Sequence, residues 1–484
     1  MRVSVADKPN ILFLMPDQLR ADFLGCYGAD FIDTPNIDRL AQKGVRYSNA
    51  CTPSPICVPA RSVLLAGVNA IRTGVLGNGQ FLRPDLAECG MKVWPEHLNE
   101  AGYDTAAIGK MHFYPWEMSM GFQHRVICED KRWLNIEDDY DRHLKANGLK
   151  KFHGNEHEGY QENRGAIVSR LPYEHSWDYF VGEEAAKYIG NHNGDKPFAM
   201  MVGFPGPHCP YDPSPGFEDL YAPEDMPEPA PESPDQPANF RQSNINGSKG
   251  SWNDVDYTEF TTAHKKKIRA HYAGLVKQID NKIGDILDAL EKSGQLDNTV
   301  IIFCSDHGDY LGDHGLIGKG TFYESSIKVP LIVNLPWATE GSVWDGPVSI
   351  EDITATILHY GGCEIPSYFD SIPLPGLGID AKIRDRVYGF LASGCMNYDG
   401  EWKLSKYTTG VVQLFNVKED PGEQNNRVDD LECFKIFRKL DAELTAQTMR
   451  SINAAHAEKL VNTSWEDLEF GRGGWKRTYP QPIY

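Results

Sequence analysis

Runs of apolar residues along the chain mark four buried strands. Three runs are almost continuously apolar, at Asn10–Met15, Phe198–Phe204 and Thr299–Cys304, and a fourth, Tyr103–Ile108, is apolar at alternate places. Continuous apolar runs of this length are typical of parallel strands that helices cover on both faces. We therefore predict that these four segments lie side by side in one buried sheet.

Each predicted strand is followed at once by polar side chains. The segments after the four strands read Pro16-Asp17-Gln18, Gly109-Lys110-Met111-His112, Pro205-Gly206-Pro207-His208 and Ser305-Asp306-His307-Gly308. The carboxyl ends of parallel strands meet at one edge of a sheet, and in open α/β sheets ligands bind at that edge. We expect these polar side chains to lie close together there.

Helical patterns alternate with the strands. The longest runs from Lys265 to Ser293, and Pro35–Gly44 predicts a shorter helix that ends at a glycine and leads into a strand at Val45–Tyr47. Strands that alternate with helices indicate the α/β class. We predict a large mixed, mostly parallel sheet sandwiched by helices.

Three parts of the chain depart from this alternation. The stretches 125–176 and 211–256 are polar and read as long insertions near the strand ends, or as disordered surface. Further on, antiparallel strands are predicted at Tyr388–Leu391, Trp402–Tyr407 and Val411–Phe415, followed by a helix at Leu431–Ile452. We therefore predict a larger α/β domain at 1–385 and a smaller C-terminal subdomain, an antiparallel sheet with a helix, at 386–484.

The composition is that of a soluble globular protein. The 484 residues are 41% hydrophobic and 24% charged, and the net charge of −20 argues against binding to nucleic acid or to anionic membranes. No apolar run is long enough to cross a membrane, and the first residues lack the features of a signal peptide. Ten cysteines without paired spacing fit a reducing compartment, so we expect a cytoplasmic protein.

Cys57 lies where another helix is predicted to begin. Pro59 suits the first helical turn, and Arg61 follows about one turn after the cysteine. Free backbone N–H groups and the helix dipole at such a position stabilise an anion, and Arg61 adds a fixed positive charge. Without further context, a buried thiol before a core helix would be the simpler interpretation.

These segments together resemble the sulfatase family of the alkaline phosphatase superfamily. The sequence Cys57-Val-Pro-Ala-Arg61 is similar to the family signature, a cysteine or serine followed by x-Pro-Ser/Ala-Arg. Other family landmarks occur in the expected order between Asn10 and Asn426: NILFLMPDQLRADFLGCYG, TPNIDRLAQKGVRYSNAC, GKMHF, SDHGDYLGDHG and LFNVKEDPGEQNN. The resemblance implies an alkaline phosphatase-like fold and hydrolysis of sulfate monoesters to an alcohol and inorganic sulfate.

A mostly oxygen-donor set follows the first and fourth strands. It consists of Asp17, Gln18, Asp306 and His307, a combination that favours a hard divalent cation. The resemblance implies that these four residues, together with residue 57, hold the metal ion. Ca²⁺ is expected first, with Mn²⁺ or Mg²⁺ as alternatives. Taken singly, each aspartate could equally be a helix or turn cap.

The remaining predicted site residues are cations and proton donors. A sulfate ester transition state spreads negative charge over several oxygens, so fixed cations and a general acid should dominate catalysis. The resemblance implies that Lys110 bridges the nucleophile and the sulfate and that His112 accepts a proton from the nucleophile. It further implies that His208 or Lys319 protonates the leaving alcohol. Arg61 would orient the nucleophile.

The resemblance also implies a modification of Cys57. In the family a formylglycine-generating enzyme oxidises this cysteine to formylglycine, whose hydrated form carries two geminal hydroxyls. One hydroxyl attacks sulfur, and deprotonation of the second then expels sulfate and restores the aldehyde. An unmodified thiol cannot follow this route.

Gln18 departs from the commoner family pattern, which has a second aspartate there. An amide removes one negative charge from the metal ligands, and glutamine at this place is similar to the phosphonate monoester hydrolases of the superfamily. A phosphonate monoester or phosphodiester hydrolase is therefore the alternative function, and side activity on such esters is expected.

Two other classes of protein fit the sequence less well. A binding protein without turnover has no need for the full set of site residues. A phosphatase with a cysteine nucleophile would need a Cys-x5-Arg loop.

The sequence leaves the ester and the assembly open. Trp116, Trp133 and Trp177 are candidates to line a pocket for an aryl group or for a cationic alcohol such as choline. The aromatic tail Trp475–Tyr484 is expected to pack on a neighbouring subunit, which predicts a homo-oligomer.

Overall fold

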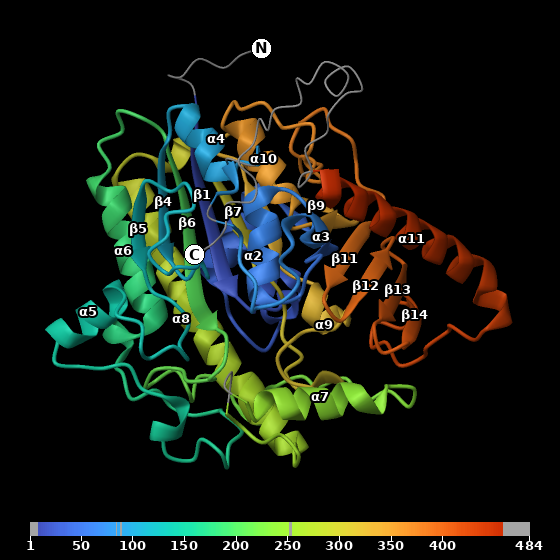
Figure 1. The fold of residues 1–484 in the computed structure, drawn as a ribbon. Helices are drawn as coiled ribbons and strands as arrows, with labels where there is room; N and C mark the ends of the chain where they lie inside the picture. Colours follow the sequence, from blue (N-terminus) through green and yellow to red (C-terminus); the bar gives the residue numbers. More distant parts are fainter. Residues whose placement is uncertain (1–7, 84, 88–89, 251–253, 458–484) are drawn as a thin grey trace, which may run out of the picture.

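An eight-stranded sheet forms the centre of the molecule (Figure 1). The computed structural model describes residues 8–83, 85–87, 90–250 and 254–457. The sheet has the order β5-β4-β6-β1-β7-β8-β2-β9. Its strands are β1 (Asn10–Asp17), β2 (Gly44–Tyr47), β4 (Asp104–Gly109), β5 (His124–Ile127), β6 (Phe198–Pro207), β7 (Thr299–Cys304), β8 (Leu331–Asn334) and β9 (Ser342–Trp344).

The four predicted strands are neighbours in this sheet and run parallel. Leu12 of β1 pairs with Met200 of β6 on one side and with Ile301 of β7 on the other, and β4 pairs with β6. Strand β8 is antiparallel to β7 and β2, whereas β9 is parallel to β2. The prediction of a mixed, mostly parallel sheet is therefore confirmed.

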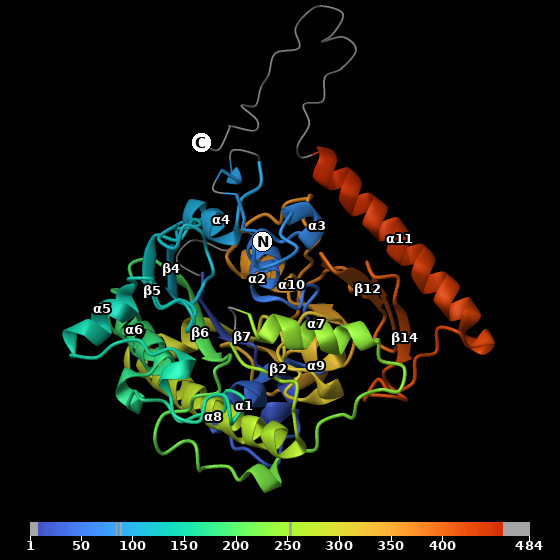
Figure 2. The ribbon, with the colours of Figure 1, turned by 60° about the horizontal axis from the view of Figure 1, so that its bottom comes forward.

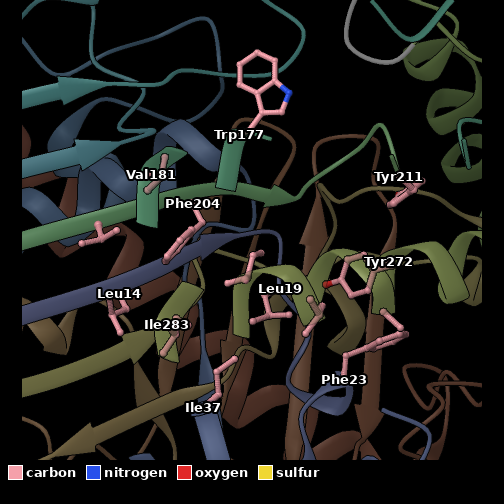
Figure 3. Close-up of a cluster of buried hydrophobic side chains, with 14 of the residues drawn as sticks. Leu14, Leu19, Phe23, Ile37, Trp177, Val181, Phe204, Tyr211, Tyr272 and Ile283 are labelled. Atoms are coloured by element: carbon pink, nitrogen blue, oxygen red, sulfur yellow. The ribbon is translucent and has the colours of Figure 1, made fainter. Parts of the chain in front are cut away.

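Helices cover both faces of the sheet. Leu12 and Leu14 of β1 pack in a core with α1 (Pro35–Lys43), α6 (Trp177–Asn191) and α8 (Thr262–Lys292), part of which is drawn in Figure 3. Ile11, Phe13 and Met15 point to the other face, where they pack with α2 (Cys57–Ala66), α4 (Trp94–Glu100) and α10 (Asp352–Tyr360). Successive side chains of a strand face opposite sides, which explains why β1 is apolar throughout.

A smaller antiparallel sheet follows in the C-terminal part. Its strands are β11 (Val387–Leu391), β12 (Gly394–Tyr398), β13 (Trp402–Tyr407) and β14 (Val412–Asn416), in sequence order. Helix α11 (Phe434–Ala457) lies along the outer side of this sheet (Figures 1 and 2), and Asn397 Nδ2 donates a hydrogen bond to Leu440 O. The predicted C-terminal sheet and helix are confirmed, although β12 was not predicted.

The two polar stretches contain more regular structure than expected. The stretch 125–176 begins inside β5, an edge strand of four half-exposed residues, and contains α5 (Asp139–Ala146). The stretch 211–256 contains α7 (Ala238–Ser248). An exposed edge strand has no long apolar run, so periodicity did not reveal β5. The aromatic tail Trp475–Tyr484 lies outside the described residues, and the division at residue 385 stays a prediction.

The other elements are short. They are β3 (Ala50–Cys51), which pairs with β10 (Val348–Ser349), and the helices α3 (Ala70–Thr73) and α9 (Glu324–Ile327). Over the described ranges, no helix combines the length and the apolar character that crossing a bilayer requires.

Candidate active site

All the site residues predicted from the sequence meet at one edge of the large sheet. Asp17 ends β1 and Gln18 follows it, and the segments after β4, β6 and β7 carry Lys110, His112, His208, Asp306 and His307. Cys57 is the first residue of α2, and Lys319 comes from the loop after β7. All of these side chains are buried except that of Lys319, which is partly exposed.

The Cys57 thiol lies in a fully buried, positively charged environment. Its sulfur is 3.2 Å from His307 Nε2 and 3.9 Å from Asp17 Oδ1. Burial alone would raise the pKa of this thiol. The positive charges of the Lys319 ammonium and of His307 outweigh burial and hold the pKa of the thiol well below its usual range. A buried group at position 57 is thus stabilised as an anion.

Four residues, Cys57 among them, have the geometry of a metal site. Asp17, Cys57, Asp306 and His307 each offer one ligand atom, and these atoms lie within 4.8 Å of one another. His307 Nδ1 lies 2.9 Å from Gly308 O, a carbonyl that can only accept, so Nδ1 carries a hydrogen and Nε2 is the nitrogen that faces Cys57 and would ligate a cation. Two carboxylates and one imidazole fit a hard divalent cation.

Arg61 connects the two carboxylates of this set. Its Nε donates to Asp306 Oδ2 over 3.0 Å and its Nη2 to Asp17 Oδ2 over 3.1 Å, and Nη1 donates to Lys110 O. Burial and the nearby Asp17 carboxylate raise the pKa of Asp306, whereas Lys110 and Arg61 overcome burial and keep the pKa of Asp17 low. The guanidinium therefore contacts the two carboxylates, and its predicted role in orienting the nucleophile stays a prediction.

Lys110 and His112 share a buried carboxylate that the sequence analysis did not identify. Lys110 Nζ lies 2.9 Å from Asp17 Oδ2 and 2.8 Å from Asp130 Oδ2. His112 Nε2 lies 3.4 Å from the same Asp130 oxygen without the alignment of a hydrogen bond. Both ring nitrogens of His112 are thus buried without a hydrogen-bond partner in the part of the chain that the structure describes. Such a ring is suited to a ligand that arrives from outside the chain.

Lys319 joins His208 and Gln18. Its Nζ lies 2.8 Å from His208 Nε2 and donates a hydrogen bond to Gln18 Oε1. Burial, followed by the positive charges of Lys319, Arg132 and Lys110, lowers the pKa of His208 to about 3, so this imidazole is neutral. The arrangement therefore holds one ammonium group against one neutral imidazole.

Comparison with known proteins identifies the family to which this architecture belongs. The model of the sulfatase family matches residues 9–363. The chain belongs to the sulfatase family. A second family model, described as N-sulphoglucosamine sulphohydrolase, C-terminal, matches residues 312–450 of this sulfatase. The family hydrolyses sulfuric esters, and the resemblance predicted from the sequence is confirmed.

Individual relatives and solved structures agree with this assignment. The chain is 31% identical to an arylsulfatase of Clostridium perfringens, covering 88% of this chain and 91% of that protein. It is 29% identical to a choline-sulfatase of Rhizobium meliloti, covering 93% and 87%. Its fold is similar to a phosphonate monoester hydrolase of Agrobacterium radiobacter, with a TM-score of 0.77 at 22% identity, covering 92% and 96%.

Two site carboxylates of this sulfatase were missed because their neighbourhood depends on tertiary structure. Asp130 lies three residues beyond the edge strand β5, inside the stretch predicted as an insertion. It also accepts hydrogen bonds from Arg132. Asp309 lies within the SDHGDYLGDHG motif, whose aspartates had been considered only for the metal. Both carboxylates are fully buried and surrounded by donors.

Aromatic rings lead from the site of this sulfatase toward the surface. The ring centre of Trp133 lies 5.3 Å from that of His112, and Trp116 lies 4.2 Å from Trp133. Tyr114, which is 55% exposed, contacts Trp116 with a centroid distance of 6.0 Å. Trp177, the first residue of α6, instead packs on Tyr140 in the core, so its predicted place in the substrate pocket is wrong.

A cavity of about 770 Å³ lies outside this cluster. Its lining includes Arg20, Asp313 and His314 beside residues of the C-terminal sheet such as Tyr398, and it contains none of the predicted site residues. Volume alone does not mark an active site, whereas convergent polar groups with shifted pKa values do. The sheet edge around Cys57 is therefore the candidate active site.

Proposed function

We propose that this sulfatase hydrolyses small sulfate monoesters with residue 57 as the nucleophile. The observation that carries the proposal is the arrangement around position 57, where Lys110, His112, His208 and Lys319 adjoin a metal-type set of ligands. Fixed cations of this kind stabilise the negative charge that develops on a sulfuryl group and its leaving oxygen.

We propose that a divalent cation is held by Asp17, Asp306, His307 and residue 57, with Gln18 as a further oxygen ligand. Ca²⁺ is the first candidate, and Mn²⁺ or Mg²⁺ are the alternatives. Gln18 Oε1 has two lone pairs, so its hydrogen bond from Lys319 leaves one for a cation. The bound ion would polarise the nucleophile and neutralise charge on the sulfuryl oxygens.

We propose that Cys57 is converted to formylglycine by a formylglycine-generating enzyme. A hydrated aldehyde supplies one hydroxyl for attack on sulfur and a second whose deprotonation releases sulfate. The unpartnered ring nitrogens of His112 support its role as the acceptor of that second proton. The low pKa of the thiol also supports an oxygen nucleophile at position 57, because groups that stabilise a thiolate also stabilise a developing oxyanion.

The other side chains have roles that follow from their contacts. Lys110 contacts Asp17 and Asp130, from where its ammonium would bridge residue 57 and the sulfate. Arg61 keeps the two metal carboxylates together and so orients the nucleophile indirectly. Lys319, with His208 beside it, would donate a proton to the leaving alcohol.

The alcohol part of the substrate is proposed to lie against Trp133 and Trp116. These rings continue from His112, so an aryl or other apolar group leaving the sulfur would meet their faces. The names of the two relatives, an arylsulfatase and a choline-sulfatase, support an alcohol of this size. No nucleic acid or membrane partner is proposed.

Phosphonate monoester or phosphodiester hydrolysis is the second candidate. The observation that favours it is Gln18, whose neutral amide replaces an acid beside the metal set. Phosphonate monoesters and phosphodiesters share a single negative charge and a tetrahedral centre with sulfate monoesters, so the same cations would stabilise all three.

A panel of esters with matched leaving groups tests these functions. Aryl, alkyl, choline and sugar sulfates, with phenyl phosphonates and phosphodiesters beside them, would be offered to converted, metal-loaded enzyme. We expect the highest kcat/KM for a sulfate. A higher value for a phosphonate or a diester would favour the second candidate, and turnover of none of the sulfates would exclude the first.

A reducing compartment is proposed for this sulfatase. The nine cysteines among the described residues are all unpaired, and several of them are buried. Free thiols in this number persist where disulfide formation is suppressed, which supports the cytoplasm.

A further inference from the structure

Five side chains, all buried except the partly exposed Lys319, form one continuous chain of hydrogen bonds behind the site. Tyr211 donates to Asp309 Oδ2 over 2.7 Å, and Gln18 Nε2 donates to the same oxygen. Gln18 Oε1 accepts from Lys319, and Lys319 Nζ lies 2.8 Å from His208 Nε2. Tyr211, Asp309 and Gln18 are completely buried, so no water competes for these bonds.

Asp309 determines which way the Gln18 amide faces. An ionised carboxylate only accepts hydrogen bonds, so the NH₂ end of the amide must face Asp309 and the carbonyl end must face Lys319. A flipped amide would place NH₂ against the Lys319 ammonium and a carbonyl against the carboxylate, and both contacts would repel. This geometry also explains the residue type at position 18, since an ionised aspartate could not donate to Asp309.

The same carboxylate fixes the backbone next to Lys319. Asp309 Oδ1 accepts from Leu311 N over 3.0 Å and from Gly318 N over 2.9 Å. Gly318 immediately precedes Lys319, so Asp309 supports this lysine both through its backbone and through Gln18. Tyr211 in turn anchors Asp309 to the segment that follows His208.

Hydrogen-bond geometry identifies Lys319 as the proton donor of the pair. His208 Nδ1 lies 2.7 Å from Cys209 O, so Nδ1 carries the hydrogen and Nε2 accepts from Lys319. An ammonium has three N–H donors, and Gln18 and His208 take two. Within the described ranges no side chain takes the third, which is left for the leaving oxygen.

We propose that Asp309 and Tyr211 are positioning residues for leaving-group protonation in this sulfatase. They act by orienting Gln18, and through it the Lys319 ammonium, without touching the ester themselves. This inference rests on the proposed ester hydrolysis, but it concerns only the departure of the alcohol, a step that sulfate and phosphonate esters share.

The dependence of rate on the leaving group tests this role. Protonation matters more as the leaving alcohol becomes more basic, so a misplaced donor slows poor leaving groups most. We expect Asp309→Asn to lower kcat/KM about tenfold or more for phenyl or alkyl esters and less than about threefold for 4-nitrophenyl esters. Tyr211→Phe removes one hydrogen bond and should show the same trend with a smaller slope.

Tyr398→Phe is the matched control, because its hydroxyl is equally buried and donates to Asn49 Oδ1 over 2.8 Å, far along the sequence from the site. It should leave the slope of log(kcat/KM) against leaving-group pKa unchanged. Equal losses for all leaving groups, or no loss, in Asp309→Asn and Tyr211→Phe would overturn the proposal.

Two features keep the outcome distinct from the proposed function. If Asp309→Asn does not fold, Tyr211→Phe alone decides, since it removes a single hydroxyl. If the wild type prefers phosphonates, the same leaving-group series is measured on phosphonate monoesters. If the sulfatase proposal fails, the wild type will show a higher kcat/KM for phosphonates than for sulfates. If the positioning role fails, the variants will show the same slope of log(kcat/KM) against leaving-group pKa as the wild type.

Discussion

Arg61 is the residue that allows two carboxylates to be buried side by side at this site. Asp17 and Asp306 are both fully buried, and each accepts a hydrogen bond from the same guanidinium. Two buried carboxylates this close to each other would not both ionise without a nearby cation. Removing one partner of a buried ion pair typically costs about 3 to 5 kcal/mol of stability. The arginine of the Cys-x-Pro-Ala-Arg motif is therefore required by the metal set as much as by the nucleophile.

The nucleophile itself gives the first prediction at the residue scale. Conversion of Cys57 to formylglycine leaves its peptide about 18 Da lighter than the cysteine form. We expect the activity per milligram to rise in proportion to the converted fraction across preparations, measured by mass spectrometry of the peptide that contains Cys57.

Cys57→Ala is the corresponding variant. It should remove turnover while the circular dichroism spectrum and the binding of a divalent ion change little, because Asp17, Asp306 and His307 remain. A fully active preparation whose Cys57 peptide showed only the thiol would contradict the formylglycine proposal.

Residue types at this site could be predicted from the sequence, but their partners could not. The motifs identified Asp17, Gln18, Asp306 and His307 as one polar group, and the structure places them together. These partners come from segments far apart in the sequence: the hydrogen bonds of Arg61 to Asp17 and Asp306 span 44 and 245 positions, and that of Gln18 to Asp309 spans 291. No local pattern in the sequence records such pairings.

At the scale of elements, a buried ion cluster joins the C-terminal sheet to the catalytic part. Lys403 of β13 lies 2.6 Å from Glu324 of α9 and 2.8 Å from Glu423, which follows β14. Lys403 faces both glutamates, and Lys328 adds a positive charge near Glu324 only, so Glu423 is the less compensated of the two. Burial, opposed by Lys403 and reinforced by Glu324, raises the pKa of Glu423 to about 7.

This cluster predicts a stability that falls as the pH rises. Below the unfolded pKa of Glu423, near 4.5, the group is protonated in both states. Between pH 4.5 and about 7 the unfolded chain has released this proton while the folded chain still holds it, so the free energy of unfolding falls across that window and levels off above it. We expect Glu423→Gln to match the wild type at pH 5 and to be more stable by roughly 1 to 3 kcal/mol at pH 8. Urea unfolding at both pH values measures this difference.

Glu401→Gln provides the control, because Glu401 is exposed and its oxygen lies 3.7 Å from Lys418. Its effect should be small and similar at both pH values. A Glu423→Gln protein that is less stable than the wild type at pH 8 would show that folding lowers the pKa of this carboxylate and that the predicted sign is wrong.

Strands and helices could be predicted where burial requires apolar residues. They were missed where their residues are polar or exposed. Strands β1, β6 and β7 are buried along their whole length, and their apolar runs were read correctly. Strand β5 at the sheet edge and β12 in the small sheet carry polar or exposed residues, and α7 lies in a proline-rich stretch with a weak apolar face. In these places tertiary contacts, more than local periodicity, select the structure.

At the scale of the whole molecule, metal binding is expected to stabilise the fold. An ion that binds only the folded chain adds about 2.7 kcal/mol when its concentration is 100 times its Kd. We therefore expect a chelator to abolish activity and to lower the Tm by about 2 to 3 °C for a chain of this size. Added Ca²⁺ or Mn²⁺ should restore both.

Asp306→Asn is the matched variant for this measurement, since it removes one ligand charge and keeps the volume of the side chain. Its Tm should respond less to Ca²⁺ than that of the wild type. Activity and Tm that are both indifferent to chelation would contradict the assignment of Asp17, Asp306 and His307 as ligands.

The complete burial of Cys57 sets an order of events in the life of the chain. Its side chain has no exposed surface, being enclosed by α2 and by the ends of β1 and β7. A second enzyme cannot reach this thiol once the sheet has formed, so the proposed oxidation must occur while the chain is still unfolded. Maturation and folding therefore compete in time. A molecule that folds first stays in the thiol form, however much maturation enzyme it later meets.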